Sequence, residues 1–588
     1  MRSTFAGLNT MVSGIHMNRL SLETVGHNIT NATTDGYSRQ NVNRVASASQ
    51  TVYTQYGAAQ VGTGTTAMAI SRARDIYADH QYWKENATSG YFQYGATNLN
   101  KIESIFNDSK NNGVQNALEK FYSAWVDCST TASTSTSRQN VINQGQILSE
   151  RLANANTQLK NQITGIYDDL SLNITEINSI TDQLVDLNES IMRTEAAGGE
   201  ANDLCDQRDL LVDKLSGLME VNVYEDAKGM YTVVSNGTSL VNGISKLTLE
   251  LSMGIPNAEY GITDFNIQIK ETGGMFDAGS GELQGQLDAV ETSKRYMDTI
   301  SDMAAFMLTS INEQHRAGAG IDEDTTTGIN FYGEDGYHYT WDSANGRLQK
   351  TKCDVTATYD DGSIYVNGVQ TTPPTTPNNA HTLKSIKYQD STNPADTTYL
   401  KGVQILDELK VNTKLTADET GQTYLATRAL AYDDPLNSGN VINNLLRPNT
   451  TGTVVYNIAA NGINGTGDGT SAVNVSTLIN CELKNSSEAG NVAGTDRPIG
   501  TVSLYSFYNT EMTTMGATAE DYNNNVEFQK DVIDQIYNLR QATSGVNWDE
   551  ELSNMIMFQQ GYQACSRCLN AMDEMLDKLV NSTGMVGR

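Results

Sequence analysis

Residues 555–579 read MIMFQQGYQACSRCLNAMDEMLDKL, and this stretch decides the fold. Its apolar side chains recur at alternating steps of three and four residues: Met555, Phe558, Tyr562, Cys565, Leu569, Met572, Leu576 and Leu579. That spacing is typical of a helix that packs against a partner helix along a narrow apolar seam. At 1.5 Å per residue, the stretch predicts a rod about 37 Å long.

The opposite end of the chain carries a matching pattern. Its apolar positions are Phe5, Leu8, Val12, Ile15, Leu22 and Ile29, with Arg19 and Gly26 at the two remaining positions of the same register. A helix with one apolar stripe needs a partner. We therefore predict that the two chain ends pair, and that both sets of residues form an assembly seam.

Proline divides the chain. All eight prolines lie between Pro256 and Pro498. Because proline interrupts helical hydrogen bonding, the ends tolerate helices and the middle does not. The predicted fold class is multidomain α+β, in which both chain ends form a long α-helical, coiled-coil-like body and β-rich outer domains are inserted.

The periodicity predicts the order of the elements. We expect helices over about 4–29, 73–106, 138–195, 203–218, 283–311 and 526–539, a break at 544–546, and a possible short helix at 441–446. Strands are expected from 221 to 270 and again between 318 and 500, with hairpin turns at Asn236-Gly237 and Asp361-Gly362. We predict four units: a terminal helical assembly domain (1–45 with 545–588), a helical bundle domain (46–221 with 281–318 and 501–544), a small β subdomain (222–280) and a β-rich variable outer domain (319–500).

Composition limits the classes of partner. The 588 residues carry a formal net charge of −30, which disfavours nucleic acid and anionic membranes because both are negatively charged. The sequence contains no run of 18 consecutive apolar residues, so it predicts no membrane-spanning helix. The first residues lack the apolar region of a signal peptide, which predicts a cytoplasmic protein or export by a route that leaves the N-terminus intact.

The sequence contains no catalytic, cofactor-binding or metal-binding pattern that we recognise. Cys565 and Cys568 form a C-x-x-C pair, but they lie in mid-helix, so we interpret them as packing residues. The acidic stretch 322–328 resembles a calcium loop only faintly, because Thr327 replaces the required glycine. We therefore predict no enzymatic activity, no cofactor and no metal.

Four segments together resemble the flagellar hook-associated protein 1 family, the hook–filament junction proteins. They are NITNATTDGYSRQ at 28–40, ANDLCDQRDLL at 201–211, INEQHRAG at 311–318, and SGVNWDEEL at 544–552 with FQQGYQA at 558–564. The first is similar to a motif shared by flagellar axial proteins, and its matching residues are Asn28, Asn31, Gly36, Tyr37, Ser38 and Arg39. Asp35 stands where proline is usual and His27 where asparagine is common.

The resemblance implies a structural axial protein that is exported unfolded through the flagellar type III apparatus and assembles through its terminal helices. Its implied partners are other copies of itself, hook protein, a second hook-associated protein on the filament side, and an export chaperone; its implied location is the extracellular flagellum. One alternative is a hook or rod subunit, although the segment 201–211 favours the junction family. A second alternative is a flagellum-borne adhesin that binds through the β-rich middle. A third is a secreted hydrolase, but residues 320–500 contain no catalytic pattern that would support it.

Overall fold

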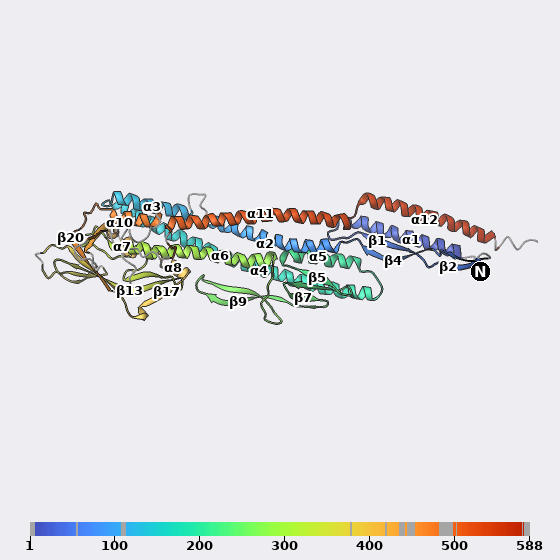
Figure 1. Cartoon of the computed structure of the whole chain (residues 1–588), viewed down its shortest axis with the longest axis horizontal. Helices are drawn as coiled ribbons and strands as arrows, with labels where there is room; N and C mark the ends of the chain where they lie inside the picture. Colours follow the sequence, from blue (N-terminus) through green and yellow to red (C-terminus); the bar gives the residue numbers. More distant parts are fainter. Residues whose placement is uncertain are drawn as a thin grey trace, which may run out of the picture.

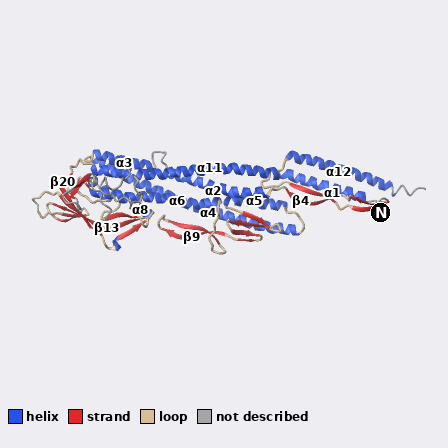
Figure 2. Cartoon of the chain, in the orientation of Figure 1, coloured by secondary structure: helices blue, strands red, loops and turns tan. Residues whose placement is uncertain are grey.

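The molecule is elongated, with a helical unit at one end and a β-rich unit at the other (Figure 1). The computed structural model describes residues 6–54, 57–106, 113–367, 369–376, 379–417, 420–433, 441–443, 453–480, 498–500, 502–578 and 580. Long helices run lengthwise between the two ends, and the strands lie along one side and at the far end (Figure 2). The α+β fold class is confirmed.

The first and last helices pair, as predicted from their matching seams. α1 spans Ala6–Asn31 and α12 spans Trp548–Asp577. A β ribbon lies beside α1: β1 (Gln40–Ala46) pairs with β4 (Thr65–Arg72), and the hairpin of β2 (Gln50–Thr54) and β3 (Gly57–Val61) extends from it. We call α1, α12 and this ribbon the terminal unit.

The central body is a bundle of long helices. They are α2 (Ile76–Phe106), α3 (Val114–Thr130), α4 (Ser135–Ala196), α5 (Asn202–Leu218), α6 (Gly281–Phe306) and α11 (Leu504–Ser544). A π-helical turn, η2 (Met307–Ile311), joins α6 to α7 (Asn312–Ala317). Helix α3 was not predicted, and the predicted helix 526–539 lies in the second half of α11.

The apolar residues of α4 form a stripe that is buried within the chain. These residues recur every three or four positions, and all of them are buried except Leu187, which is half-buried: Ile163, Ile166, Leu170, Ile174, Ile177, Ile180, Leu184, Leu187 and Ile191. In α12, by contrast, the only buried residue among those described is Glu551. The bundle therefore has an extended apolar core, whereas the described part of the terminal unit buries few apolar side chains, such as Met17 and Val25.

Two small β structures lie against the bundle. A four-stranded sheet contains β5 (Asn222–Glu225), β6 (Tyr231–Ser235), β7 (Thr238–Asn242) and β8 (Ser245–Lys246), and β9 (Leu249–Asn257) pairs with β10 (Ile262–Ile269). The predicted turn at Asn236-Gly237 joins β6 to β7, with φ of 39° and 82°. Positive φ at both positions is what a two-residue hairpin turn requires.

A ten-stranded sheet forms the far end. Its strands are β11 (Gly318–Ala319), β12 (Tyr337–Asp342), β13 (Arg347–Tyr359), β14 (Ile364–Val366), β15 (Val369–Thr372), β16 (Leu383–Asp390), β17 (Thr397–Leu400), β18 (Arg428–Asp433), β19 (Val441–Asn443) and β20 (Thr453–Ile463). Short helical segments interrupt it: η3 (Pro394–Asp396), α8 (Val403–Glu408), α9 (Thr413–Thr416) and η4 (Gly421–Tyr424).

Two predictions for this region need correction. Residues 441–443 of the possible helix 441–446 form strand β19, which pairs with β18, because hydrogen bonding to a neighbouring strand overrides weak local preference; residues 444–446 lie outside the described residues. The region also contains a helix that was not predicted, α10 (Thr470–Asn480), which packs on α3 in the bundle. The predicted turn at Asp361-Gly362 does join β13 to β14.

Candidate assembly interface

α1 and α12 run antiparallel and lie close together because small residues face the contact. Gly7 faces the Met572 side chain, and a Cβ atom placed on Gly14 would lie 3.0 Å from Sγ of Cys565. Near the middle of the pair, Gly561 faces the side chain of Asn18. Since larger residues at Gly7 and Gly14 would separate the helices, these glycines determine how closely the chain ends approach.

The predicted seam of α12 faces α1 and its ribbon. Cys565 and Met572 contact α1, and the guanidinium of Arg44 lies 4.3 Å from the ring centre of Phe558. The remaining described positions, Met555, Leu569 and Leu576, are half-buried, and Tyr562 is 38% exposed. Leu579 lies outside the described residues.

Residues of α1 outside its apolar pattern also contact α12. The contacts come from Gly7, Gly14, Asn18 and Asn28, most of which precede a predicted seam residue by one position. The predicted residues Leu8, Val12, Ile15, Leu22 and Ile29 are all half-buried, and Phe5 lies outside the described residues. One residue corresponds to about 100° of rotation around a helix, so these small and polar residues lie beside the apolar positions on α1.

The turn after α1 connects the terminal unit to the bundle, and we call it the elbow. Asn28 is buried there: its amide nitrogen donates to the Gln40 carbonyl at 3.0 Å and to Glu551 at 3.2 Å, and its oxygen accepts from Gln40 N and the Tyr37 hydroxyl. All four hydrogen-bonding positions of this amide, two N–H groups and two oxygen lone pairs, are thereby engaged. This explains why an asparagine, rather than an apolar residue, stands at position 28 in the last turn of α1.

Two further residues of the motif shape the same turn. Asn31 donates its side-chain amide to the His27 carbonyl at 3.0 Å. Gly36 has φ of 77°, and a Cβ atom there would approach the Leu210 side chain at 3.1 Å. The left-handed conformation and the close approach of α5 together require glycine.

Arg39 and Ser38 fasten the elbow to α12 and α5. Arg39 donates from Nε to Glu551 at 2.7 Å and forms an ion pair with Glu550 at 2.9 Å, while its backbone nitrogen donates to the Ser544 carbonyl. The backbone nitrogen of Ser38 donates to Asp206 at 2.9 Å. Two segments that the sequence singled out independently, 28–40 and 201–211, therefore meet in space.

A network of arginine and aspartate side chains surrounds this junction. Arg72 pairs with Asp206 at 2.9 Å and with Asp209 at 2.7 Å. Arg74 pairs with Asp209 at 3.1 Å and with Asp79 at 2.7 Å. Arg540, near the end of α11, pairs with Asp79 at 2.8 Å and with Asp213 at 2.9 Å. The shared carboxylates link β4, α2, α5 and α11 into one network.

Ionisation differs among the three α5 carboxylates. Burial alone would raise the pKa of Asp209, but the charges of Arg74 and Arg72 outweigh it and lower that pKa below its usual value. Burial raises the pKa of Asp206 and of Asp213, and their arginine partners offset this only in part. Asp209 is therefore the most firmly ionised of the three carboxylates, and it forms ion pairs with both Arg72 and Arg74.

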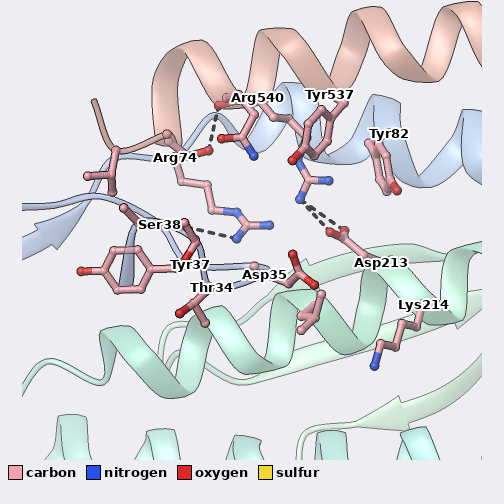
Figure 3. Close-up of a pocket in the computed structure, with 18 of the residues that line it drawn as sticks. Thr34, Asp35, Tyr37, Ser38, Arg74, Tyr82, Asp213, Lys214, Tyr537 and Arg540 are labelled. Carbon is pink, nitrogen blue, oxygen red and sulfur yellow. Dashed lines mark hydrogen bonds and ion pairs between the residues drawn. The ribbon is translucent and has the colours of Figure 1, made fainter. Parts of the chain in front are cut away.

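A cavity of about 550 Å³ lies beside this network. Figure 3 shows Arg74, Asp213 and Arg540 around it, with the loop of Thr34 to Ser38 on one side and α11 on the other. The ion pairs and hydrogen bonds described above hold the elbow beside this cavity.

Part of this network lies in segments that were singled out from the sequence. The segment 201–211 contains Asp206 and Asp209, and the segment 28–40 contains Arg39. Arg72, Arg74 and Arg540 were missed because no local pattern marks them and, apart from the Asp79 partner of Arg74, their partners are distant in sequence. Only the recurrence of aspartate at 206, 209 and 213, which places the three on neighbouring turns of one helix face, could have indicated a site for arginines.

The other candidates raised by the sequence contain no second site. The Asp322 carboxylate accepts hydrogen bonds from the Thr326 backbone at 3.0 Å and hydroxyl at 2.6 Å within its own loop. Among the residues described, no three His, Cys, Asp or Glu side chains are grouped to hold a metal ion. Cys565 is half-buried against α1, and Cys568 is exposed. Nor does any described helix combine the length and apolar character needed to span a membrane.

Comparison with known proteins agrees with this architecture. The model of the flagellar hook-associated protein FlgK helical domain matches residues 99–332, and that of the flagellar basal body rod FlgEFG protein C-terminal region matches residues 540–582. Flagellar hook-associated protein 1 of Bacillus subtilis is 25% identical and that of Escherichia coli 24%, with coverage of 100% and 98% of this chain and 100% and 99% of theirs.

A solved structure supports the fold. The flagellar hook junction protein FlgK from Burkholderia pseudomallei matches with a TM-score of 0.53 and 19% identity, covering 79% of this chain and all of that one. The matches extend from end to end, and they include both the helical body and the C-terminal helix. The chain belongs to the flagellar hook-associated protein 1 (FlgK) family, the structural, non-enzymatic junction proteins of the bacterial flagellum.

Proposed function

We propose that the terminal unit is the self-assembly element with which this junction protein joins hook to filament. The observation that carries the proposal is the antiparallel pairing of α1 with α12 at one end of the molecule, far from the β-rich sheet (Figure 1). Unlike the bundle, this pair contains few buried side chains. Apolar surface left in contact with water gains about 25 cal/mol per Å² when a neighbouring molecule covers it, which favours assembly.

The division of the chain supports separate roles. Residues 1–45 with 545–588 form the assembly domain in this proposal, and the ribbon residues 46–72 act with it because they pack along α1. The bundle (73–221, 281–318 and 501–544) acts as a rigid spacer, and the small β subdomain (222–280) and outer domain (319–500) face outward. The elbow network fixes the terminal unit relative to this spacer.

The family membership places the chain among axial components of the flagellum, outside the cell. We further propose that its neighbours are copies of itself, hook protein on one side and a second hook-associated protein on the other. Export through the flagellar type III apparatus, with a chaperone that binds the unfolded termini, would deliver it there.

A deletion strain tests the proposal. Without this chain, hooks should still form and flagellin should be lost to the medium, and restoring the full chain should restore filaments. A version lacking residues 6–31 should be made and secreted without restoring them. Filaments that form normally in the deletion strain would contradict the proposed role, and filaments restored by the truncated chain would contradict the role of the terminal unit.

A further inference from the structure

His381 lies between two carboxylates in the β-rich outer domain. Its Nδ1 atom is 2.7 Å from Oδ2 of Asp361, and its Nε2 atom is 3.1 Å from Oδ1 of Asp324. The histidine precedes β16, and Asp361 lies in the turn between β13 and β14. Asp324 belongs to the acidic stretch 322–328, which we call the acidic loop. One imidazole ring therefore joins three segments of the chain.

The two contacts determine how many protons the ring must carry. A neutral imidazole has one N–H donor, and its second nitrogen is an acceptor; an ionised carboxylate only accepts. The neutral ring can therefore donate to one of the two aspartates, whereas the imidazolium donates to both. The Ser363 hydroxyl, 3.3 Å from Nδ1, does not alter this count, because it donates to Asp361 at 2.6 Å.

His315, in α7, has the opposite arrangement. Its Nδ1 atom lies 2.7 Å from the carbonyl oxygen of Ile329, and its Nε2 atom accepts a hydrogen bond from the backbone nitrogen of Ala426 at 2.9 Å. One acceptor and one donor fit a neutral ring, and burial lowers the pKa of His315 to about 4. The partners of each ring therefore decide which charge state the fold accommodates.

Two tyrosines also face His381. Tyr359 stacks on the ring with centroids 4.2 Å apart, and the centroid of Tyr365 is 6.0 Å away. Burial, reinforced by the charge of Asp324, raises the pKa of both hydroxyls, so both stay protonated at neutral pH. Each hydroxyl donates to Asp324, Tyr359 to its carbonyl oxygen and Tyr365 to its carboxylate. They therefore hold the acidic loop in either charge state of the ring.

The proton that is exchanged near neutral pH belongs to the ring. The hydrogen bond from the Ser363 hydroxyl is the largest influence on Asp361, and together with His381 it lowers the pKa of Asp361 to about 2. Asp322 is a further carboxylate nearby, and it accepts hydrogen bonds within the acidic loop. An ordinary histidine titrates near pH 6.5, well above an ordinary aspartate.

We propose that His381 is a proton-operated latch on the acidic loop. As an imidazolium, the ring holds Asp361 and Asp324 together. When the Nε2 proton passes to water, the remaining N–H stays on Nδ1, which faces the closer and more buried Asp361, and the lone pair of Nε2 then faces the carboxylate of Asp324. The latch is therefore complete at low pH and opens on the side of the acidic loop as the pH rises.

Exposure makes His381 responsive to the surroundings. Its side chain is 30% exposed, so the ring exchanges protons with the medium. His338 also lies between two carboxylates, but its side chain is 1% exposed. Because the family is located outside the cell, the pH of the external medium sets the state of the latch. The latch lies in the outer domain and is independent of the proposed assembly role.

Hydrogen exchange in the full chain at pH 5.5 and pH 8 tests the latch. The amide of Gly320 donates to the Thr326 carbonyl and that of Thr326 to Asp322, so both should lose protection when the acidic loop opens. After correction for the intrinsic effect of pH on exchange, their protection should be about tenfold lower at pH 8, because a hydrogen bond to an ionised group is lost. Equal protection at the two pH values would overturn the proposal.

Three variants identify the group that titrates. His381→Gln, which cannot take up a proton, should show the lower protection at both pH values. Asp324→Asn should show the higher protection at both, because its amide can accept from the imidazolium or donate to the neutral ring. His16→Gln, at an exposed histidine of α1, is the matched control and should keep the tenfold difference. A pH dependence that persists in His381→Gln and Asp324→Asn would assign the effect to another group and refute the latch.

Discussion

Replacing Asp209 by asparagine should loosen the elbow more than any other single charge change there. Asp209 is 1% exposed and accepts hydrogen bonds from Arg72 and from the Tyr231 hydroxyl, each at 2.7 Å, while also pairing with Arg74. Asparagine keeps the shape of the side chain but removes the charge that two arginines share. Removing one partner from a buried ion pair costs about 3–5 kcal/mol, because the remaining charge is left uncompensated.

Hydrogen exchange reports this loss locally, which matters because a chain of several domains does not unfold in two states. The amide of Ser38 donates to Asp206 and that of Gln40 to Asn28, so both are protected only while the elbow is closed. A cost of about 3–5 kcal/mol corresponds to exchange faster by roughly two to four orders of magnitude. Asp186→Asn, at an exposed position on α4, is the matched control and should leave both rates unchanged.

The effect should depend on pH with a definite sign. Because the folded-state pKa of Asp209 lies below its ordinary value, its stabilising contribution is complete above about pH 4 and is lost as the pH falls further. The difference between Asp209→Asn and the unaltered chain should therefore be constant from pH 6 to 8 and should shrink below pH 4. Equal exchange rates for the two proteins at pH 7 would refute the view that ion pairs hold the elbow.

Three other predictions concern separate parts of the molecule. Gly14→Leu should separate α1 from α12 at Cys565 and speed proteolysis within α1. Gly26→Ala should slow proteolysis there, because nothing lies within 4 Å of the added atom and alanine favours the helix by about 1 kcal/mol. Equal rates of proteolysis in the two variants would contradict this prediction. Burial, with the charges of nearby carboxylates, raises the pKa of Asp302 to about 7. Asp302→Asn should therefore stabilise the bundle by about 1–3 kcal/mol at pH 8 and by progressively less as the pH falls from 7 to 4. Thermal unfolding across that pH range measures this stabilisation, and a pH-independent effect would be inconsistent with ionisation of Asp302. Arg138 donates to the Gln422 carbonyl at 2.8 Å and to the Ala132 carbonyl at 3.0 Å. Arg138→Met should leave these carbonyls unsatisfied, at a cost of about 1–3 kcal/mol, and raise the rate of hydrogen exchange in residues 422–427. An unchanged rate there would count against this anchoring role.

The helical skeleton was predictable because its pattern is repetitive. The stripe from Ile163 to Ile191 recurs over many turns of α4, so the periodicity signal accumulates, and the proline-free ends of the chain marked the regions where long helices could form. The helices α3 and α10 were missed because they are shorter and carry no such extended repeat. Strand β19 was assigned to a helix because its pairing with β18 is a tertiary contact that three residues cannot reveal.

The candidate interface was predictable in outline but not in orientation. Apolar periodicity identified the pairing of α1 with α12, yet the contact also includes Gly7, Gly14 and Asn18, which an apolar pattern does not select. Close helix approach depends on small residues, and these give no hydrophobic signal. The elbow network was recognised only through its motif residues, because ion pairs such as Arg540 with Asp79 join positions far apart in the chain.

The central claim is that copies of this chain meet through the terminal unit. The most direct measurement is an electron cryomicroscopy map of the assembled hook–filament junction at a resolution that separates helices. The account predicts that neighbouring copies make contact through α1, that α12 remains paired with α1 in the same chain, and that the ten-stranded sheet faces outward. A map in which copies touch only through the β-rich end, with α1 exposed to solvent, would contradict it.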